Sequence, residues 1–115
     1  MALTPQQIHD VTAMMDAYIA RIRPPEKIRH ELDIGWRLEN QFVFIFELRP
    51  QWKNKKVIIT YDFAKATWIQ TRKHWNIYWM RGNLKWDRYG PLESTVNLQR
   101  FLIEVEKDPY GCFQG

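Results

Sequence analysis

The 115-residue sequence is 45% hydrophobic and 15% aromatic, enough apolar material for one compact core but not for two. We therefore expect a single domain over residues 1–115. Charged residues make up 26% and the net charge is only +4, a mixture that argues against a disordered chain. Cys112 is the single cysteine and the three histidines are scattered, so we expect no disulfide, no metal and no cofactor.

We expect neither a membrane-spanning helix nor a secretion signal in this sequence. No stretch reaches the roughly 18 to 20 continuous apolar residues of a membrane-spanning helix. The first residues, MALTP, do not have the basic-then-apolar layout of a secretion signal. We therefore expect a cytoplasmic protein without a membrane partner.

Residues 5–22 are predicted to form the first helix. Thr4 can cap it, and Gln7 stands where a capping box places Glu or Gln. Pro24 and Pro25 end it. One apolar stripe follows the helical period: Ile8, Val11, Met15, Tyr18, Ile19 and Ile22.

Four or five strands follow, with apolar side chains recurring at every second residue. The first spans 28–38 and places His30 in the apolar row, partly buried; the second spans 42–49, has apolar groups on both faces and is predicted to be central. The third spans 55–63, and 64–70 either continues it or departs through a bulge. The fourth and fifth span 74–80 and 84–89, joined by the Gly82-Asn83 turn signal.

A second helix is predicted to begin at Ser94 or Thr95 and to end before Asp108. The tail that follows is rich in turn residues but contains Phe113, which can pack back onto the body. Short polar connections between strands favour a meander. The fold class is therefore α+β, an antiparallel meander sheet of four to five strands with an N-terminal and a C-terminal helix packed on it.

Positive charge is concentrated in the middle of the sequence. Residues 49–89 contain ten basic and two acidic residues, a net charge of +8, while the rest of the chain carries −4. Five of the six tryptophans lie in the same stretch. This combination indicates an acidic partner.

The strongest candidate site is an aromatic and basic cluster on the fourth and fifth strands and just before them. Rings that stack on bases, with Arg and Lys that follow phosphates, suit single-stranded nucleic acid. We expect this surface to bind an anionic macromolecule without catalysis. The candidate binding residues are Arg49, Trp52, Trp75, Trp79, Arg81, Lys85, Trp86 and Arg88, with Tyr89 at the end of the cluster.

Two alternatives to nucleic-acid binding stay open for this cluster. Tryptophans in a small domain commonly fill the core, and Arg commonly packs on Trp for structural reasons. Alternatively, the same surface binds an acidic protein surface, with its exposed rings as apolar anchors, or an anionic small ligand. The sequence does not define the oligomeric state.

A divalent-metal nuclease is a further alternative. Asp33 and Glu47 are expected on the outward rows of neighbouring strands, and Glu47-Leu48-Arg49 has the outline of the E-x-K nuclease element. Arg does not readily lose a proton to assist a water, and charged pairs across antiparallel strands are common. The sequence therefore favours binding over catalysis.

Three motifs carry a family resemblance over essentially the whole chain. They are RPQW at 49–52, WNIYWMRGNLKWDRY at 75–89 and the closing DPYGCFQG at 108–115. With this dense tryptophan and arginine pattern, the sequence resembles the bacterial family known as domain of unknown function 3024. The resemblance implies no activity and no cofactor.

Overall fold

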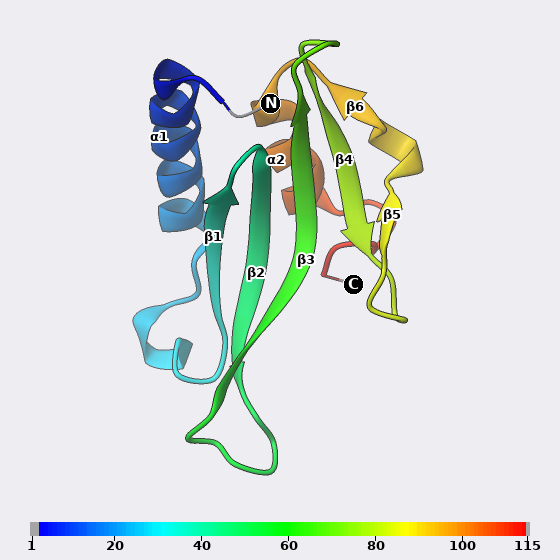
Figure 1. Ribbon diagram of the computed structural model, residues 1–115. Coiled ribbons are helices and arrows are strands. Elements are labelled where there is room, and N and C mark those ends of the chain that lie inside the picture. Colours follow the sequence, from blue (N-terminus) through cyan, green and yellow to red (C-terminus); the bar gives the residue numbers. More distant parts are fainter. Residues whose placement is uncertain (1–2, 115) are drawn as a thin grey trace.

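The structure confirms the first helix predicted from the sequence. The computed structural model describes residues 3–114 (Figure 1), and helix α1 spans Pro5–Ile22. Its capping box is complete: the Gln7 amide donates to Thr4 Oγ1 at 3.1 Å, and the Thr4 amide donates to Gln7 Oε1 at 2.9 Å. These two contacts satisfy amide groups that a helix start otherwise leaves without partners.

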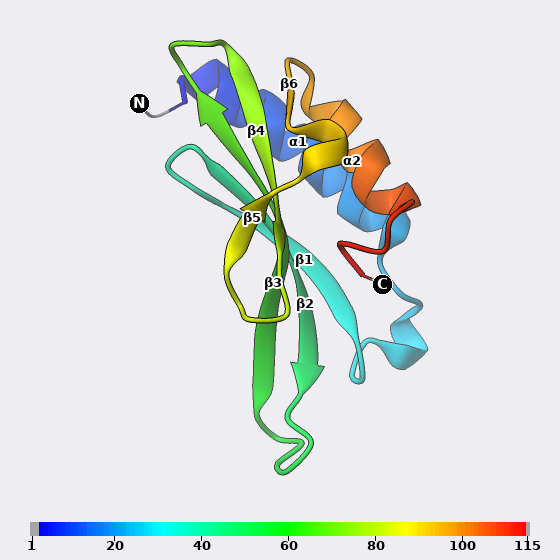
Figure 2. The same ribbon diagram turned by 90° about the vertical axis from the view of Figure 1, so that its right-hand side faces the viewer.

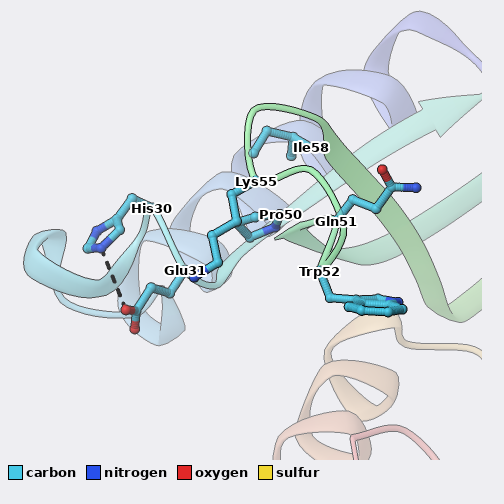
Figure 3. A pocket seen from close by; sticks show the side chains of 7 residues that line it. All are labelled: His30, Glu31, Pro50, Gln51, Trp52, Lys55 and Ile58. Atoms are coloured by element: carbon cyan, nitrogen blue, oxygen red, sulfur yellow. Dashed lines mark ion pairs between the residues drawn. The ribbon is translucent and has the colours of Figure 1, made fainter.

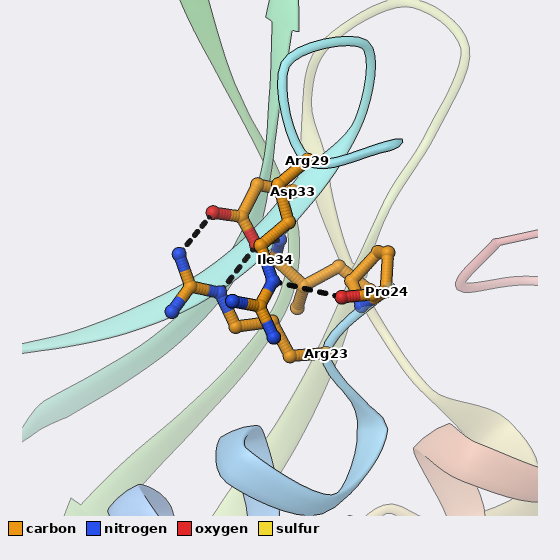
Figure 4. A network of polar contacts seen from close by, with 5 residues as sticks. All are labelled: Arg23, Pro24, Arg29, Asp33 and Ile34. Carbon is orange, nitrogen blue, oxygen red and sulfur yellow. Dashed lines mark hydrogen bonds and ion pairs between the residues drawn. The ribbon is translucent and has the colours of Figure 1, made fainter. Parts of the chain in front are cut away.

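The first strand begins later than predicted. Strand β1 spans Asp33–Glu39, and the segment before it contains the 3₁₀ helix η1 (Glu26–Ile28). Figure 4 shows why: Arg23 binds both carboxylate oxygens of Asp33, at 2.7 and 2.6 Å, and Arg29 Nε donates to the Pro24 carbonyl at 2.8 Å. These contacts close the segment between α1 and β1 into a compact turn. The alternation of apolar residues before Asp33 therefore does not correspond to a strand. The prediction that His30 is partly buried in a strand is therefore wrong, because its side chain is exposed.

The sheet is an antiparallel meander, so the α+β prediction is confirmed. Its strands run in the order β1, β2 (Phe42–Pro50), β3 (Ile58–Ile69), β4 (His74–Met80) and β5 (Trp86–Arg88). A short strand that the sequence did not predict, β6 (Ser94–Thr95), pairs with β4 beside β5.

The third strand is one long strand with a bulge. β3 is twelve residues long, and its pairing with β2 shifts between Ile45 and Phe46, so that Phe63 has no partner opposite it. The alternative in which 64–70 continues the strand is therefore correct. The bulge sharpens the local twist, and the lower part of the β2–β3 hairpin extends beyond the helices (Figure 1).

Both helices cover the same face of the sheet (Figure 2). Helix α2 spans Leu98–Lys107. Its cap is Asn97, whose Oδ1 accepts a hydrogen bond from the Gln99 amide at 2.9 Å. The prediction of Ser94 or Thr95 as the cap is wrong, because these residues pair with β4. Side chains from both layers fill the core, with Val43, Ile45, Ala64, Ala66 and Ile77 from the sheet and Met15, Phe101, Leu102 and Val105 from the helices.

The tail packs back onto the body, as predicted. Asp108 ends α2 in the left-handed conformation, and its carboxylate accepts hydrogen bonds from the amides of Phe113, at 3.1 Å, and Gln114, at 2.8 Å. The Phe113 ring is buried, with its centroid 4.8 Å from that of the Tyr89 ring. These contacts fix the end of the described chain.

Within residues 3–114, neither helix is long and apolar enough to cross a membrane.

Candidate functional site

One face of the sheet has no helix over it. The helices lie on the opposite side (Figure 2), and we call the uncovered side the open face. Pairing across the strands places Arg37, Phe44, Lys65, Tyr78 and Arg88 in one row on this face. Because directly paired residues in antiparallel strands point to the same side, the row crosses from β1 to β5.

Aromatic rings dominate this face. The centroid of the Phe44 ring lies 6.2 Å from that of Phe42 and 6.1 Å from that of Trp86. All the aromatic side chains of the group are partly exposed. We define the open-face patch as Phe42, Phe44, Phe46, Tyr78 and Trp86 with the three cations Arg37, Lys65 and Arg88.

Lys65 lies at the centre of the open-face patch. Its ammonium nitrogen is 4.6 Å from the ring centroid of Tyr78, 4.8 Å from that of Trp86 and 5.8 Å from that of Phe42. Burial lowers the pKa of Lys65, whereas the negative ring faces favour the ammonium form. Among residues 3–114 no carboxylate pairs with it.

The two arginines of the open-face patch differ in their partners. Arg37 binds both carboxylate oxygens of Asp62, at 2.7 and 2.8 Å, and also pairs with Glu39, and these partners raise its pKa. Its guanidinium lies 4.2 Å from the Phe44 ring centroid, so it holds that ring while its own charge is compensated. Arg88 donates to the Glu93 carbonyl at 2.8 Å, a neutral partner that leaves its charge available.

Gly35 makes room for the third phenylalanine of the open-face patch. It pairs with Phe46 across β1 and β2, and a Cβ atom at Gly35 would lie 2.8 Å from Phe46 Cε1. The ring of Phe46 therefore lies against the backbone of β1. A ring packed over a strand glycine in this way covers backbone that a side chain would otherwise shield.

The predicted binding residues do not form one surface. Trp86 and Arg88 lie in the open-face patch, as described above. Trp75 lies on the other face with 5% of its surface exposed, its ring centroid 5.3 Å from that of Trp68. Trp79 is partly buried against the same core. The prediction that Trp75 lies on an accessible surface is therefore wrong. Strand alternation directs Trp75 and Trp79 toward the helices.

The remaining predicted residues lie at the rim or farther away. Arg81 and Lys85 are exposed in the turn between β4 and β5, with Arg81 Nη1 3.8 Å from Asp87 Oδ2. Arg49 Nη2 pairs with Glu47 Oε1 at 3.0 Å. Trp52 is 81% exposed in the loop between β2 and β3, while Tyr89 at the end of the predicted cluster is fully buried.

Sequence reasoning missed most of the open-face patch. The alternation in 42–49 did place three phenylalanines in one row, and that row is the signal that could have found them. Because apolar residues occupy both faces of this segment, the sequence instead indicated a central strand that is covered on both sides. Which face the helices cover depends on packing between distant segments, and Arg37, Lys65 and Tyr78 join the row only through strand pairing.

The two carboxylates of the nuclease alternative do not converge. Asp33 pairs with Leu48, and Glu47 pairs with Ile34, so their side chains point to opposite faces of the sheet. Asp33 is bound by Arg23, while Glu47 contacts Arg49 and accepts from Gln114 Nε2 at 3.0 Å. In the part of the chain that the structure describes, no three His, Cys, Asp or Glu side chains are grouped to hold a metal ion.

Comparison with protein families agrees with the resemblance seen in the sequence. The family model described as Domain of unknown function (DUF3024) matches residues 3–115, nearly the whole chain. The protein belongs to the DUF3024 family. No curated protein and no solved structure matches it.

Proposed function

We propose that this DUF3024 protein is a non-enzymatic cytoplasmic domain that binds single-stranded nucleic acid through the open-face patch. The observation that carries the proposal is a sheet face without a helix over it, on which five partly exposed rings share one patch with Lys65 and Arg88. Two further exposed cations, Arg81 and Lys85, lie in the turn that joins β4 to β5.

The chemistry of the open-face patch suits both parts of a nucleotide. Rings stack on bases of any sequence at about 1–3 kcal/mol each. Lys65 and Arg88 supply charges for the phosphates between those bases, and neither is paired with a carboxylate among the described residues. Arg37 is compensated by Asp62, so we assign it to holding the Phe44 ring.

A single strand fits this surface better than a duplex. Bases in a duplex are stacked on each other, so their faces are not accessible to protein rings, whereas a single strand can splay its bases onto an aromatic surface. A broad sheet also does not enter the major groove as one helix does. We therefore expect sequence-tolerant binding with a preference for unpaired strands.

Charge removal tests the proposal. We expect the double variant Lys65→Gln, Arg88→Gln to bind a labelled single-stranded oligonucleotide more weakly than the wild type. The slope of log affinity against log salt should fall by about 1.4, because each phosphate contact on a single strand contributes about 0.7. Fluorescence anisotropy over a salt series measures both quantities.

The matched control for this experiment is Lys107→Gln. Lys107 is an exposed cation in the last turn of α2, on the side of the sheet opposite the open-face patch (Figure 2). It should leave the affinity and the salt slope unchanged. If the double variant behaves like this control, the open-face patch does not bind phosphates and the proposal is wrong.

A protein partner is the second candidate for the same surface. The observation that favours it is the apolar row of rings along β2, where Phe42 and Phe44 are neighbours and Phe46 follows. Affinity from apolar anchors depends little on salt, whereas phosphate contacts give a steep dependence. The salt series therefore separates the two candidates.

A further inference from the structure

A second basic and aromatic surface lies at the far end of the β2–β3 hairpin. We call residues 51–57, which connect the two strands, the Trp52 loop. Trp52 is exposed over most of its surface, and Lys53, Lys55 and Lys56 beside it are exposed as well. No ion pair involves these lysines among residues 3–114. In Figure 1 the loop is the lowest point of the molecule, beyond both helices.

The Trp52 loop borders a pocket of about 690 Å³. Figure 3 shows its lining: Pro50 and Ile58 are apolar, Trp52 and Lys55 come from the loop, and His30 with Glu31 lie across from them. This volume is within the range of pockets that hold small organic ligands, about 300–1,000 Å³. A ring for stacking, a cation and polar groups at the rim are what one nucleotide requires.

Two residues that line the pocket, Pro50 and Ile58, lie by strand parity on the side of the open-face patch. Along β2, Phe46, Leu48 and Pro50 alternate onto the side that carries the open-face patch, and Pro50 pairs with Ile58 at the pocket. From Phe42 to Pro50 the strand advances eight residues, or about 26 Å at 3.3 Å per residue. A strand bound on the open-face patch can therefore be followed along β2 into the pocket.

We propose that the pocket takes one base of the same nucleic-acid strand, stacked on Trp52, while lysines of the Trp52 loop contact its phosphates. This inference rests on the proposed function and defines the extent of the site. At 3.4 Å per nucleotide, the spacing in a fully stacked strand, the span accommodates at most about eight nucleotides, and fewer where the bases are splayed onto the protein. The open-face patch and the Trp52 loop thus act as two contact points on one polyanion.

Oligonucleotide length is the variable that tests this inference. We expect wild-type affinity for oligothymidylates to rise steeply from about four to about eight nucleotides and to level off by about twelve. Trp52→Ala should weaken binding of the longer oligonucleotides about fivefold or more and have little effect on the shortest. Binding to the pocket should also quench a fluorescence component that Trp52→Ala removes.

Two controls separate the possible failures. Tyr110→Ala removes another exposed aromatic side chain, in the tail after α2, and should change binding at no length. If Trp52→Ala matches this control at every length while Trp86→Ala weakens binding, the extended site is wrong and the open-face proposal stands. If the wild type binds no oligonucleotide, both proposals are wrong.

Discussion

Two tryptophans of this chain lie on opposite faces of the sheet although their sequence contexts are similar. Trp75 and Trp86 both lie in the basic segment, but Trp75 is buried beneath the helices and Trp86 lies beside Lys65 on the open face. The difference arises from strand parity, since successive side chains point to opposite faces. One residue can therefore contribute to folding and the other to binding.

Replacing each tryptophan by alanine tests this division. We expect Trp75→Ala to lower the free energy of unfolding by about 3–5 kcal/mol, because it opens a cavity in the core. Trp86→Ala should cost less stability but weaken oligonucleotide binding by about 1–3 kcal/mol, the value of one stacked base. Urea denaturation and anisotropy measure the two effects. Equal losses of stability would contradict the assignment of Trp86 to the surface.

Contacts between elements attach helix α2 to the far edge of the sheet. The buried Tyr89 hydroxyl, just after β5, donates to Glu104 Oε2 at 2.7 Å, and Arg100 Nη1 donates to Glu104 Oε1 at 2.9 Å. These donors hold the pKa of Glu104 below its usual value of 4.5. The charged form of Glu104 therefore stabilises the fold at neutral pH.

Acid should weaken this attachment. Because the pKa of Glu104 is lower in the folded state than in the unfolded state, its stabilisation is complete above about pH 4.5 and is lost as the pH falls through the folded value. We expect Glu104→Gln to be less stable than the wild type at pH 7 by about 1–3 kcal/mol.

The difference in unfolding free energy between the wild type and Glu104→Gln should become smaller below pH 4.5. Urea denaturation of both proteins at several pH values measures this difference. If the difference stays constant from neutral pH down through the folded pKa of Glu104, the charge on this side chain contributes no stability.

Elements with strong local signals could be predicted from the sequence. The capping box of Thr4 and Gln7 marks the start of α1, and the alternation of 74–80 gives β4 with its observed bounds. β1 and the cap of α2 were misplaced because contacts between separate segments decide them. The Arg23 and Asp33 ion pair shortens the first strand, and pairing with β4 takes Ser94 and Thr95 into the sheet.

The candidate site was predictable only in part, for a similar reason. Residue types and charge pointed to residues 49–89, and this segment supplies Trp86 and Arg88 to the surface that we propose. The side of the sheet that the helices cover is a property of the whole chain. Residues from β1 and β2 were missed because strand pairing brings them beside β4 and β5.

At the scale of the whole molecule, the arrangement is a two-layer fold with one face of the sheet left uncovered. Both helices use the same side for the core, and the other side carries rings and cations in place of a third layer. The molecule is elongated, with extents of 45 × 29 × 24 Å, since the β2–β3 hairpin extends past the helices. This shape offers a long surface that a flexible strand can follow.

Mapping the bound strand on the protein is the most direct measurement of this account. Two-dimensional NMR of the isotopically labelled protein, titrated with a single-stranded oligonucleotide, reports on each backbone amide and each indole. We expect the largest shifts at the Trp86 indole and at the amides of Lys65, Tyr78 and Arg88, with little change in α1 and α2. Shifts confined to the helices, or no shifts at a saturating oligonucleotide concentration, would contradict it.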